Sequence, residues 1–400
     1  MKLDVIPGTA WPDMDRLLDT LGAPGGDTRL VGGAVRDTLL ALPVSDIDLA
    51  TRLQPTEVME RLKAAGLKAV PTGLAHGTVT AVVGGRPVEV TTLRRDVETD
   101  GRHAVVAFTD DWRADAARRD FTINALFADP LSGEVFDYFG GEADIAARRI
   151  RFIGDPEARI AEDHLRILRF FRFHARFSDG PPDPEGLAAC TARANDLMAL
   201  SRERIADELL KLLGLARPHA TVAVMFACRI FAPVVPEIDA AGVAALGRLI
   251  AEESRLGVAP EGLRRLAALL PADPHRAGDV ALRLRLSKAA RARLSCAAAR
   301  NAADATSDPA ALAYRHGLPC ARDRLLLGEA PDIARLRALD GWEKPRLPIA
   351  GGALIARGLP AGPIVATTLR EIEAAWVDAN FPGGAALDAI VRQHVAAAAQ

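Results

Sequence analysis

Two aspartates separated by one residue, Asp46 and Asp48, are the first side chains whose types and spacing could do chemistry. In an extended strand, residues two apart lie on the same face, so both carboxylates would point one way while Ile47 packs inward. Carboxylates at this spacing can bind Mg²⁺, which prefers oxygen ligands. Two aspartates at this spacing, without further motifs, are also typical of a solvated strand edge. The surrounding sequence therefore decides the interpretation.

A glycine pair followed by a cation lies just upstream of these aspartates. Gly32 and Gly33 stand at a predicted strand-to-helix turn, and Arg36 follows them on the helix. Glycines let the backbone approach a phosphate closely, and a helix N-terminus presents free N–H groups to it. A tight turn alone would also explain the glycines. Together with the carboxylates, however, the segment indicates a nucleoside-triphosphate site in which metal bridges phosphates and carboxylates.

Two later segments could complete such a site. Glu89 lies between two valines of a predicted strand and could be a third carboxylate, either a general base or a metal ligand. Arg119 could contact phosphate or ribose, and Asp120 could accept a sugar hydroxyl while capping a helix that starts at Phe121. The simpler interpretations are an outward-facing glutamate and a capped helix with solvated arginines.

A third segment has the side chains that could recognise a nucleobase. Asp163, Arg166, Arg169 and Arg172 recur every three residues, which predicts a slanting polar stripe on a helix over residues 163–177. The Asp163 carboxylate would accept a hydrogen bond from the amino group of cytosine or adenine, and Arg166 would donate one to the neighbouring ring nitrogen. Uracil and guanine present the opposite order of donor and acceptor, so they would not match. Each unpaired polar group would cost on the order of 1–3 kcal/mol. The plainer alternative is an amphipathic helix with an ion pair between residues three apart.

The expected elements follow from hydrophobic periodicity and turn residues. We expect strands at 29–32, 45–51, 78–83 and 87–92 with another around residue 70, helices at 34–42 and 55–65, and a mobile loop at 98–109. From about residue 115 onward we expect helices, including 163–177 and 201–213. For one nucleotide to be held, the acidic pair and the base-reading pair must face a single cleft.

Composition narrows the class of protein. The 400 residues have 49% hydrophobic side chains and a net charge of -2, which excludes global disorder and a wholly basic nucleic-acid coat. A local basic groove remains open, since eight arginines lie within residues 148–176. No apolar run suits a membrane helix and no secretory signal is recognisable, so a cytoplasmic protein without a membrane partner is expected. Cys190, Cys228, Cys296 and Cys320 are far apart, and predict neither a zinc site nor a disulfide framework.

Taken together, these motifs resemble the class II CCA-adding enzyme and bacterial poly(A) polymerase family of nucleotidyltransferases. The resemblance is strong from about residue 28 to 214 and fainter beyond. It rests on the segments 32–37, 46–48, 76–80, 89–94, 118–125, 137–144, 162–166 and 201–209. Two departures are visible: Ala41 stands where a helix-ending glycine is usual, and Ala353 replaces an aspartate often found near the tail.

The resemblance implies a role for each candidate residue. Asp46 and Asp48 would bind Mg²⁺ in a two-metal mechanism, with Glu89 as base or further ligand. Gly32, Gly33, Arg36, Arg119, Asp120 and Asn124 would hold the triphosphate and ribose. Asp163, Arg166, Arg169 and Arg172 would form the pocket for the base.

The resemblance also implies an α+β fold. A small, palm-like mixed-sheet head at residues 1–143 would be followed by a helical neck at 144–214, a helical body at 215–335 and a helical tail at 336–400. The head would be catalytic, the neck would recognise the base and the tail would contact tRNA. Nothing in the sequence indicates the oligomeric state.

The implied activity is Mg-dependent, template-independent addition or repair of the 3'-terminal CCA of tRNA from CTP and ATP, with release of pyrophosphate. Poly(A) polymerase, or an enzyme that adds only CC or only A, would use the same residues. A third hypothesis is a helical RNA-binding protein without activity, which the intact carboxylates and arginines disfavour.

Overall fold

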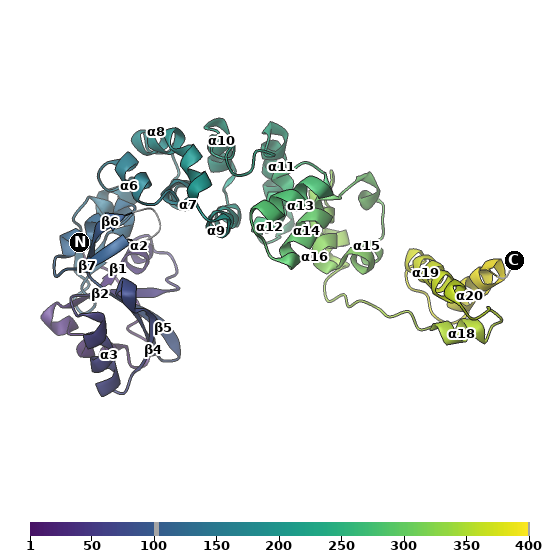
Figure 1. The fold of residues 1–400 in the computed structure, drawn as a ribbon, viewed down its shortest axis with the longest axis horizontal. Helices are drawn as coiled ribbons and strands as arrows, with labels where there is room; N and C mark the ends of the chain where they lie inside the picture. Colours follow the sequence, from purple (N-terminus) through teal and green to yellow (C-terminus); the bar gives the residue numbers. More distant parts are fainter. Residues whose placement is uncertain (100–103, 399–400) are drawn as a thin grey trace. The chain divides into compact units, whose positions relative to one another are not determined.

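The computed structural model describes residues 1–99 and 104–398 of the chain. One mixed sheet lies in the first third of the chain, and helices make up most of the remainder (Figure 1). This arrangement confirms the predicted α+β class. Within the described residues, no helix is both long and apolar enough to cross a membrane.

Contacts divide the chain into two compact units, and each is described here by itself. The first contains Met1–Leu212 with Ala227–Val234, and the second contains Leu213–Phe226 with Val235–Gln400. This division is coarser than the four domains expected from the sequence, so the boundaries of head, neck, body and tail stay predictions.

A seven-stranded sheet is the scaffold of the first unit, with strand order β3-β4-β5-β2-β1-β8-β9. Strands β2 and β5 pair in parallel, whereas the other pairs in this sheet are antiparallel. The strands are β1 (Thr28–Val31), β2 (Ile47–Thr51), β3 (Lys68–Gly73), β4 (Thr78–Val83), β5 (Arg86–Thr92), β8 (Phe127–Ala128) and β9 (Val135–Phe136). The parallel register places Asp48 directly beside Glu89, so two of the predicted catalytic carboxylates lie on the same face of the sheet.

The helices of the first unit pack on this sheet or follow it in the chain. They are α1 (Met14–Thr20), α2 (Gly33–Leu39), α3 (Pro55–Ala64), α4 (Trp112–Ala117), α5 (Gly141–Ala146), α6 (Pro156–Glu162), α7 (Arg166–Phe177), α8 (Pro184–Ala192) and α9 (Arg202–Leu213). The short 3-10 helices are η1 (Ala23–Gly25), η2 (Leu74–His76), η3 (Thr122–Asn124) and η4 (Ala194–Ala199). Asp155 and Asp183 each cap a helix that has proline in its first turn, so local sequence fixes where α6 and α8 begin.

Two predictions about secondary structure are wrong. Residues 98–109 are not simply a loop, because β6 (Arg94–Thr99) and β7 (Ala104–Phe108) pair as an antiparallel hairpin; residues 100–103 lie outside the described structure. The expectation of helix alone beyond residue 115 also missed β8 and β9. These strands are two residues long, which is too short to show a period of two in the sequence.

Ala41 adopts φ of 53°, the left-handed conformation that glycine tolerates best. The departure from the family pattern therefore leaves the backbone of this turn in the conformation that glycine would favour. The strain is confined to the segment between α2 and β2, which leads into Asp46.

The second unit is helical throughout the residues described. Its elements are α10 (His219–Ala227), α11 (Ala240–Leu256), α12 (Gly262–Leu269), α13 (Pro274–Arg283), α14 (Lys288–Ala298), η5 (Ala302–Ala305), α15 (Pro309–His316), α16 (Leu318–Leu327), α17 (Ile333–Arg337), α18 (Gly351–Ile355), α19 (Pro363–Asp378) and α20 (Gly384–Ala398). Aspartates again cap helices that begin with proline, here Asp273 before α13 and Asp308 before α15.

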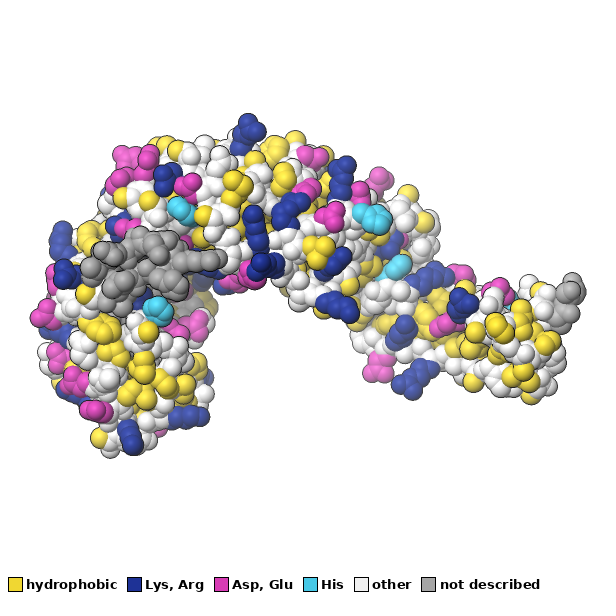
Figure 2. Space-filling model, viewed as in Figure 1, with side chains coloured by type: hydrophobic (Ala, Val, Ile, Leu, Met, Phe, Trp, Pro, Cys, Tyr) yellow, Lys and Arg dark blue, Asp and Glu magenta, His cyan; other side chains and the backbone are white. Residues whose placement is uncertain are grey.

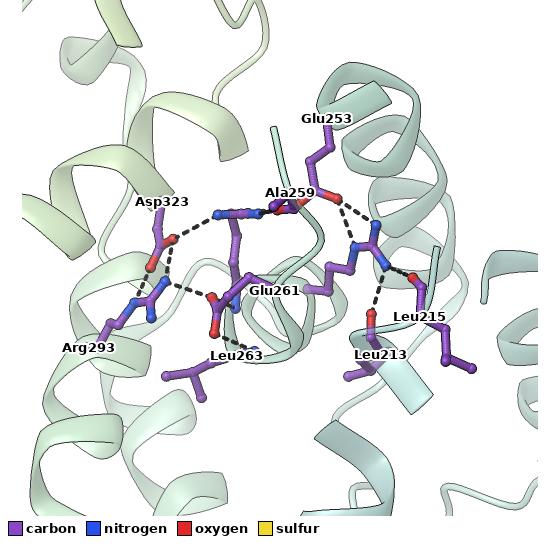
Figure 3. Close-up of polar contacts among 10 residues, drawn as sticks. Leu213, Leu215, Glu253, Ala259, Glu261, Leu263, Arg293 and Asp323 are labelled. Atoms are coloured by element: carbon purple, nitrogen blue, oxygen red, sulfur yellow. Dashed lines mark hydrogen bonds and ion pairs between the residues drawn. The ribbon is translucent and has the colours of Figure 1, made fainter. Parts of the chain in front are cut away.

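A chain of alternating charges joins the helices of this unit (Figure 3). Glu253 on α11 lies 2.7 Å from both Arg264 and Arg265 on α12. Asp323 on α16 accepts two hydrogen bonds from Arg293 on α14. Arg265 is only 1% exposed and donates to the carbonyls of Leu213, the last residue of α9, and of Leu215. Because these buried charges are paired and hydrogen-bonded, they specify how the helices meet. 

A disulfide joins Cys296 on α14 to Cys320 on α16, with Cα atoms 6.1 Å apart. The expectation that the cysteines form no disulfide framework is thus wrong for this pair. Their 24-residue separation has no diagnostic pattern, since only the antiparallel packing of two helices brings them together. Cys190 and Cys228 are free thiols.

Replacing Arg265 by alanine should destabilise the second unit by roughly 3–5 kcal/mol, because two carbonyls and part of the Glu253 carboxylate lose a buried partner. Arg357→Ala is the matched control, since its ion pair with Asp388 is exposed and should contribute under about 1 kcal/mol. Urea unfolding followed by circular dichroism measures both. Equal midpoints for the two variants would show that the buried network does not stabilise this unit.

Candidate active site

One polar cleft of about 360 Å³ in the first unit gathers most of the predicted site residues. Its lining consists of Gly32, Gly33, Arg36, Asp48, Arg118, Arg119, Asp120, Asn124, Asp163, Arg166, Arg169 and Phe173. Five arginines against three aspartates give this lining an excess of positive charge, which suits a polyanionic ligand. Another cavity of the head is similar in size, but it is lined mainly by apolar side chains such as Trp11 and Val44.

The glycine turn and α2 form one wall of the cleft. Gly32 has φ of 66°, and a Cβ atom there would approach the Arg119 guanidinium at 3.4 Å. Arg36 is buried and bonded to Asp37 and Asn124, and its guanidinium lies 4.4 Å from the centre of the Phe177 ring. Burial lowers the pKa of Arg36, although Asp37 opposes the shift. The cation is thus held rigidly beside the backbone that could bind phosphate.

The carboxylates lie where β2 begins. Asp48 is half-buried, whereas Asp46 precedes the strand and Glu89 is exposed, and neither Asp46 nor Glu89 lines the cleft. Burial, followed by repulsion from Glu89 and Asp46, raises the pKa of Asp48 to about 6, although Arg119 opposes this. Repulsion from Glu89 and Asp46 adds to the effect of burial, and a bound cation would relieve that repulsion.

These carboxylates fit Mg²⁺ better than a metal enclosed by protein ligands. Within the described residues, no group of three or more His, Cys, Asp or Glu side chains is arranged to hold a metal ion. Mg²⁺ is usually bound by one or two carboxylates together with substrate phosphates and water. Asp46 and Asp48 could supply the protein's share of such a site, and the nearby arginines could hold the phosphates.

A buried aspartate orients Arg118 and Arg119, and the Arg119 guanidinium lies beside Gly32. Asp115 accepts from Arg118 at 2.8 Å and from Arg119 at 3.0 Å. Burial opposes ionisation of Asp115, but the charges of Arg119 and Arg118 outweigh it and hold the pKa below its usual value. The sequence analysis did not single out Asp115, which lies three and four residues before its partners, the spacing of neighbours on a helix.

Asp120 differs from its predicted role as a helix cap. The following residues form the single turn η3, and Asp120 instead accepts from the Phe121 backbone, from Asn124 at 2.9 Å and from Arg169 at 2.5 Å. Burial opposes its ionisation, but Arg169 and these hydrogen bonds lower its pKa below the usual value. Both carboxylate oxygens already accept hydrogen bonds, so the predicted contact with ribose stays a prediction.

The base-reading residues are arranged differently from the predicted stripe. Asp163 ends α6 with φ of -150° and ψ of 105°, and α7 begins only at Arg166. The helix is interrupted for about one turn between α6 and α7. The three-residue spacing of polar side chains continues across this interruption, so the sequence pattern does not reveal it. The Arg166 side chain donates to Glu162 and to the carbonyls of Arg159 and Arg118, whereas the Asp163 carboxylate pairs with Arg204. Both nevertheless line the cleft that contains Asp48, as one nucleotide would require.

Helix α9 provides partners that the sequence analysis missed. Arg204 lies 2.7 Å from Asp163, and Glu208, one turn later, lies 2.5 Å from Arg172 and 3.8 Å from Arg169. Their four-residue spacing on an amphipathic helix was the available signal. Arg172 itself does not line the cleft, so its predicted contact with the base stays a prediction without support from the geometry.

Substituting Asp120 by asparagine should destabilise the protein near neutral pH, towards the lower end of the roughly 3–5 kcal/mol typical of a broken buried pair, because Arg169 is partly exposed. Since the folded-state pKa is lowered, wild-type Asp120 stabilises above its unfolded pKa and loses this contribution as pH falls through the folded value. Unfolding free energies measured from neutral to acid pH should therefore converge for the two proteins. A gap that is independent of pH would contradict the assignment.

Two family models match the chain. The family described as "Poly A polymerase head domain" matches residues 28–151, and "Probable RNA and SrmB- binding site of polymerase A" matches residues 182–241. The first match covers the sheet and the glycine turn, and the second begins just before α8.

Curated relatives and solved structures extend the similarity. The human "CCA tRNA nucleotidyltransferase 1, mitochondrial" is 34% identical over 371 residues, covering 89% of this chain and 84% of the relative. A "CCA-adding enzyme" from Levilactobacillus brevis is 42% identical over 199 residues, about half of each chain.

Among solved structures, the Bacillus stearothermophilus CCA-adding enzyme in complex with CTP matches with a TM-score of 0.71 and 28% identity, covering 92% of this chain and 94% of that one. The Thermotoga maritima enzyme complexed with tRNA_CCA shares the fold, with a TM-score of 0.69 at 22% identity over 96% and 95% of the chains. Its sequence, its fold and the residues gathered in one cleft show that the chain belongs to the family of CCA-adding enzymes, the CCA tRNA nucleotidyltransferases.

Proposed function

We propose that this protein adds or repairs the 3'-terminal CCA of tRNA, using CTP and ATP and releasing pyrophosphate. The observation that carries the proposal is the single cleft lined by Asp48, by phosphate-binding arginines, and by Asp163 with Arg166. The relatives' names and the solved complexes with CTP, ATP and tRNA support the same substrates.

In this proposal the two ends of the cleft hold the two ends of one nucleotide. Arg36 and Arg119, beside the turn at Gly32, bind the triphosphate through guanidinium groups that other side chains already orient. The 3'-hydroxyl of the RNA attacks the α-phosphate, and pyrophosphate leaves with both electrons of the broken P–O bond. Positioning and charge stabilisation account for most catalysis of this type.

Asp46 and Asp48 would hold Mg²⁺, which when bound lowers the pKa of the attacking hydroxyl and neutralises charge on the phosphates. Asp48 must be ionised to bind a cation, and its raised pKa means that protons compete with the metal near pH 6. Glu89 lies beside Asp48 in the sheet register, which supports its role as a base or further ligand. Mg²⁺ dependence is part of the proposal.

Nucleotide choice would depend on Asp163 and Arg166. The Arg166 guanidinium is already held in place by three acceptors. Its remaining N–H groups would therefore bind a base with little further loss of conformational entropy. Asp163 supplies the acceptor for the amino group of cytosine or adenine. With uracil or guanine, the Asp163 carboxylate would face a carbonyl acceptor and the Arg166 guanidinium would face an N–H donor.

A family member that synthesises poly(A), or adds only CC or only A, would use the same cleft. The match to a poly(A) polymerase head model agrees with either activity, whereas the long match to the human tRNA enzyme favours CCA addition. The expected cytoplasmic location also stays a prediction, since that human relative is named as mitochondrial.

Nucleotide incorporation tests the proposal. Full-length protein is given tRNA lacking CCA, tRNA lacking only the final A, or an unrelated RNA, with CTP or ATP alone or together and with Mg²⁺ or a chelator. We expect two cytidines and then one adenosine on the first tRNA, one adenosine on the second, and no incorporation with the chelator.

Each alternative has its own pattern in that experiment. Repeated adenosine addition to any RNA would indicate poly(A) synthesis, and addition that stops after CC or needs a CC end would indicate a partial activity. If no nucleotide is incorporated with either Mg²⁺ or Mn²⁺, the result would favour the hypothesis of an RNA-binding protein without activity.

Substituting Asp163 or Arg166 by alanine should relax nucleotide choice more than it weakens triphosphate binding. Loss of one discriminating hydrogen bond corresponds to roughly 1–3 kcal/mol, or about 5- to 150-fold in the ratio of kcat/KM values. Competition of CTP with UTP and of ATP with GTP measures the ratio. Asp179→Ala, an exposed aspartate after α7, is the control. Unchanged rejection of UTP in both variants would refute the assignment.

A further inference from the structure

An uninterrupted run of positive charge lies in the second unit. Residues 280–303 contain six arginines and lysines and no aspartate or glutamate, although the whole chain has slightly more acidic than basic residues. The six are Arg283, Arg285, Lys288, Arg291, Arg293 and Arg300. The segment extends from the end of α13 through α14 into the first turn of η5.

Four of these six cations have partners, and Arg285 is one of them. Arg283 pairs with Glu237, and Arg293 with Asp323 and Glu261. Arg300 donates to backbone carbonyls, among them that of Leu270 after α12. Folding of the helices accounts for these three arginines.

Lys288 and Arg291 are different, because both are exposed and neither has a side-chain partner among the residues that the structure describes. They lie three residues apart on α14, so their side chains project from neighbouring positions on one face. Figure 2 shows dark-blue side chains on the surface where Figure 1 places α12–α14.

The stability of α14 does not explain these two cations. Like charges three residues apart repel each other, and cations in the first turn face the positive end of the helix dipole. The first turn of α14 contains no acidic residue to compensate them. Exposed neighbours such as Ala289 and Ala292 are small, so an extended polyanion could approach the helix closely.

We propose that Lys288 and Arg291, the α14 basic face, contact the phosphate backbone of the RNA substrate. This inference rests on the proposed function and assigns part of the RNA-binding surface to α14. The contacts would be to phosphates and therefore independent of sequence, contributing affinity and orientation and leaving the choice of nucleotide to the cleft.

Salt-dependent binding of tRNA lacking CCA tests the proposal with full-length protein. K288Q/R291Q should weaken binding about tenfold at moderate salt and reduce the slope of log affinity against log salt by about 1.5, because two phosphate contacts are lost. K288R/R291K keeps both charges and should bind like wild type. Neither substitution should lower the thermal unfolding midpoint, since both side chains are exposed and K288Q/R291Q also removes the repulsion between like charges.

K63Q/K68Q removes two exposed lysines from the head and is the matched control for net charge. An equal loss of affinity in this control would overturn the proposal, because it would show a general charge effect. Unchanged affinity and slope in K288Q/R291Q, or an effect of that variant on anionic vesicles but not on tRNA, would also overturn it. If wild type neither binds nor extends tRNA, the proposed function itself fails.

Discussion

The ion pair between Asp120 and Arg169 is the contact on which the geometry of the cleft depends. Asp120 directly follows Arg118 and Arg119, which we propose bind phosphate, and Arg169 lies on α7, which begins at Arg166 of the proposed base-recognition pair. Aromatic side chains reinforce the junction: the rings of Phe121 and Phe173 lie 5.3 Å apart, and Phe152 stacks on Phe170. A nucleotide has a fixed length, so its two ends can be bound together only if this junction is rigid.

Positive charge in the cleft is held in place before a substrate arrives. Arg118 and Arg119 share Asp115, and Arg36 is bonded to Asp37 and Asn124. The entropy of immobilising these side chains is therefore lost during folding and not during binding. The chain has a net charge close to zero although arginines outnumber aspartates in the lining of the cleft. Asp37 and Asp115, buried behind these arginines, offset part of their charge.

The sequence predicted the chemistry of the site better than its shape. Period-two alternation and the glycine turn located β2, β5 and α2, because these elements are determined locally. The parallel pairing that places Asp48 beside Glu89 could not be predicted, since strand order depends on contacts distant in sequence. The break before Arg166 was missed for a similar reason: the backbone of Asp163 is extended, while the polar spacing continues unchanged. Arg204 and Asp115 bind other side chains of the site, and although the motif at residues 201–209 includes Arg204, its spacing does not identify Asp163 as the partner.

Arg204 donates a hydrogen bond to one carboxylate oxygen of Asp163. In the proposed role of Asp163, the amino group of a base would share that oxygen or displace the guanidinium, so binding would exchange one polar contact for another and gain little net affinity. Modest affinity for the correct base, combined with a large free-energy cost for a mismatched base, suits an enzyme that binds one base, releases it and then binds a different base at the same position.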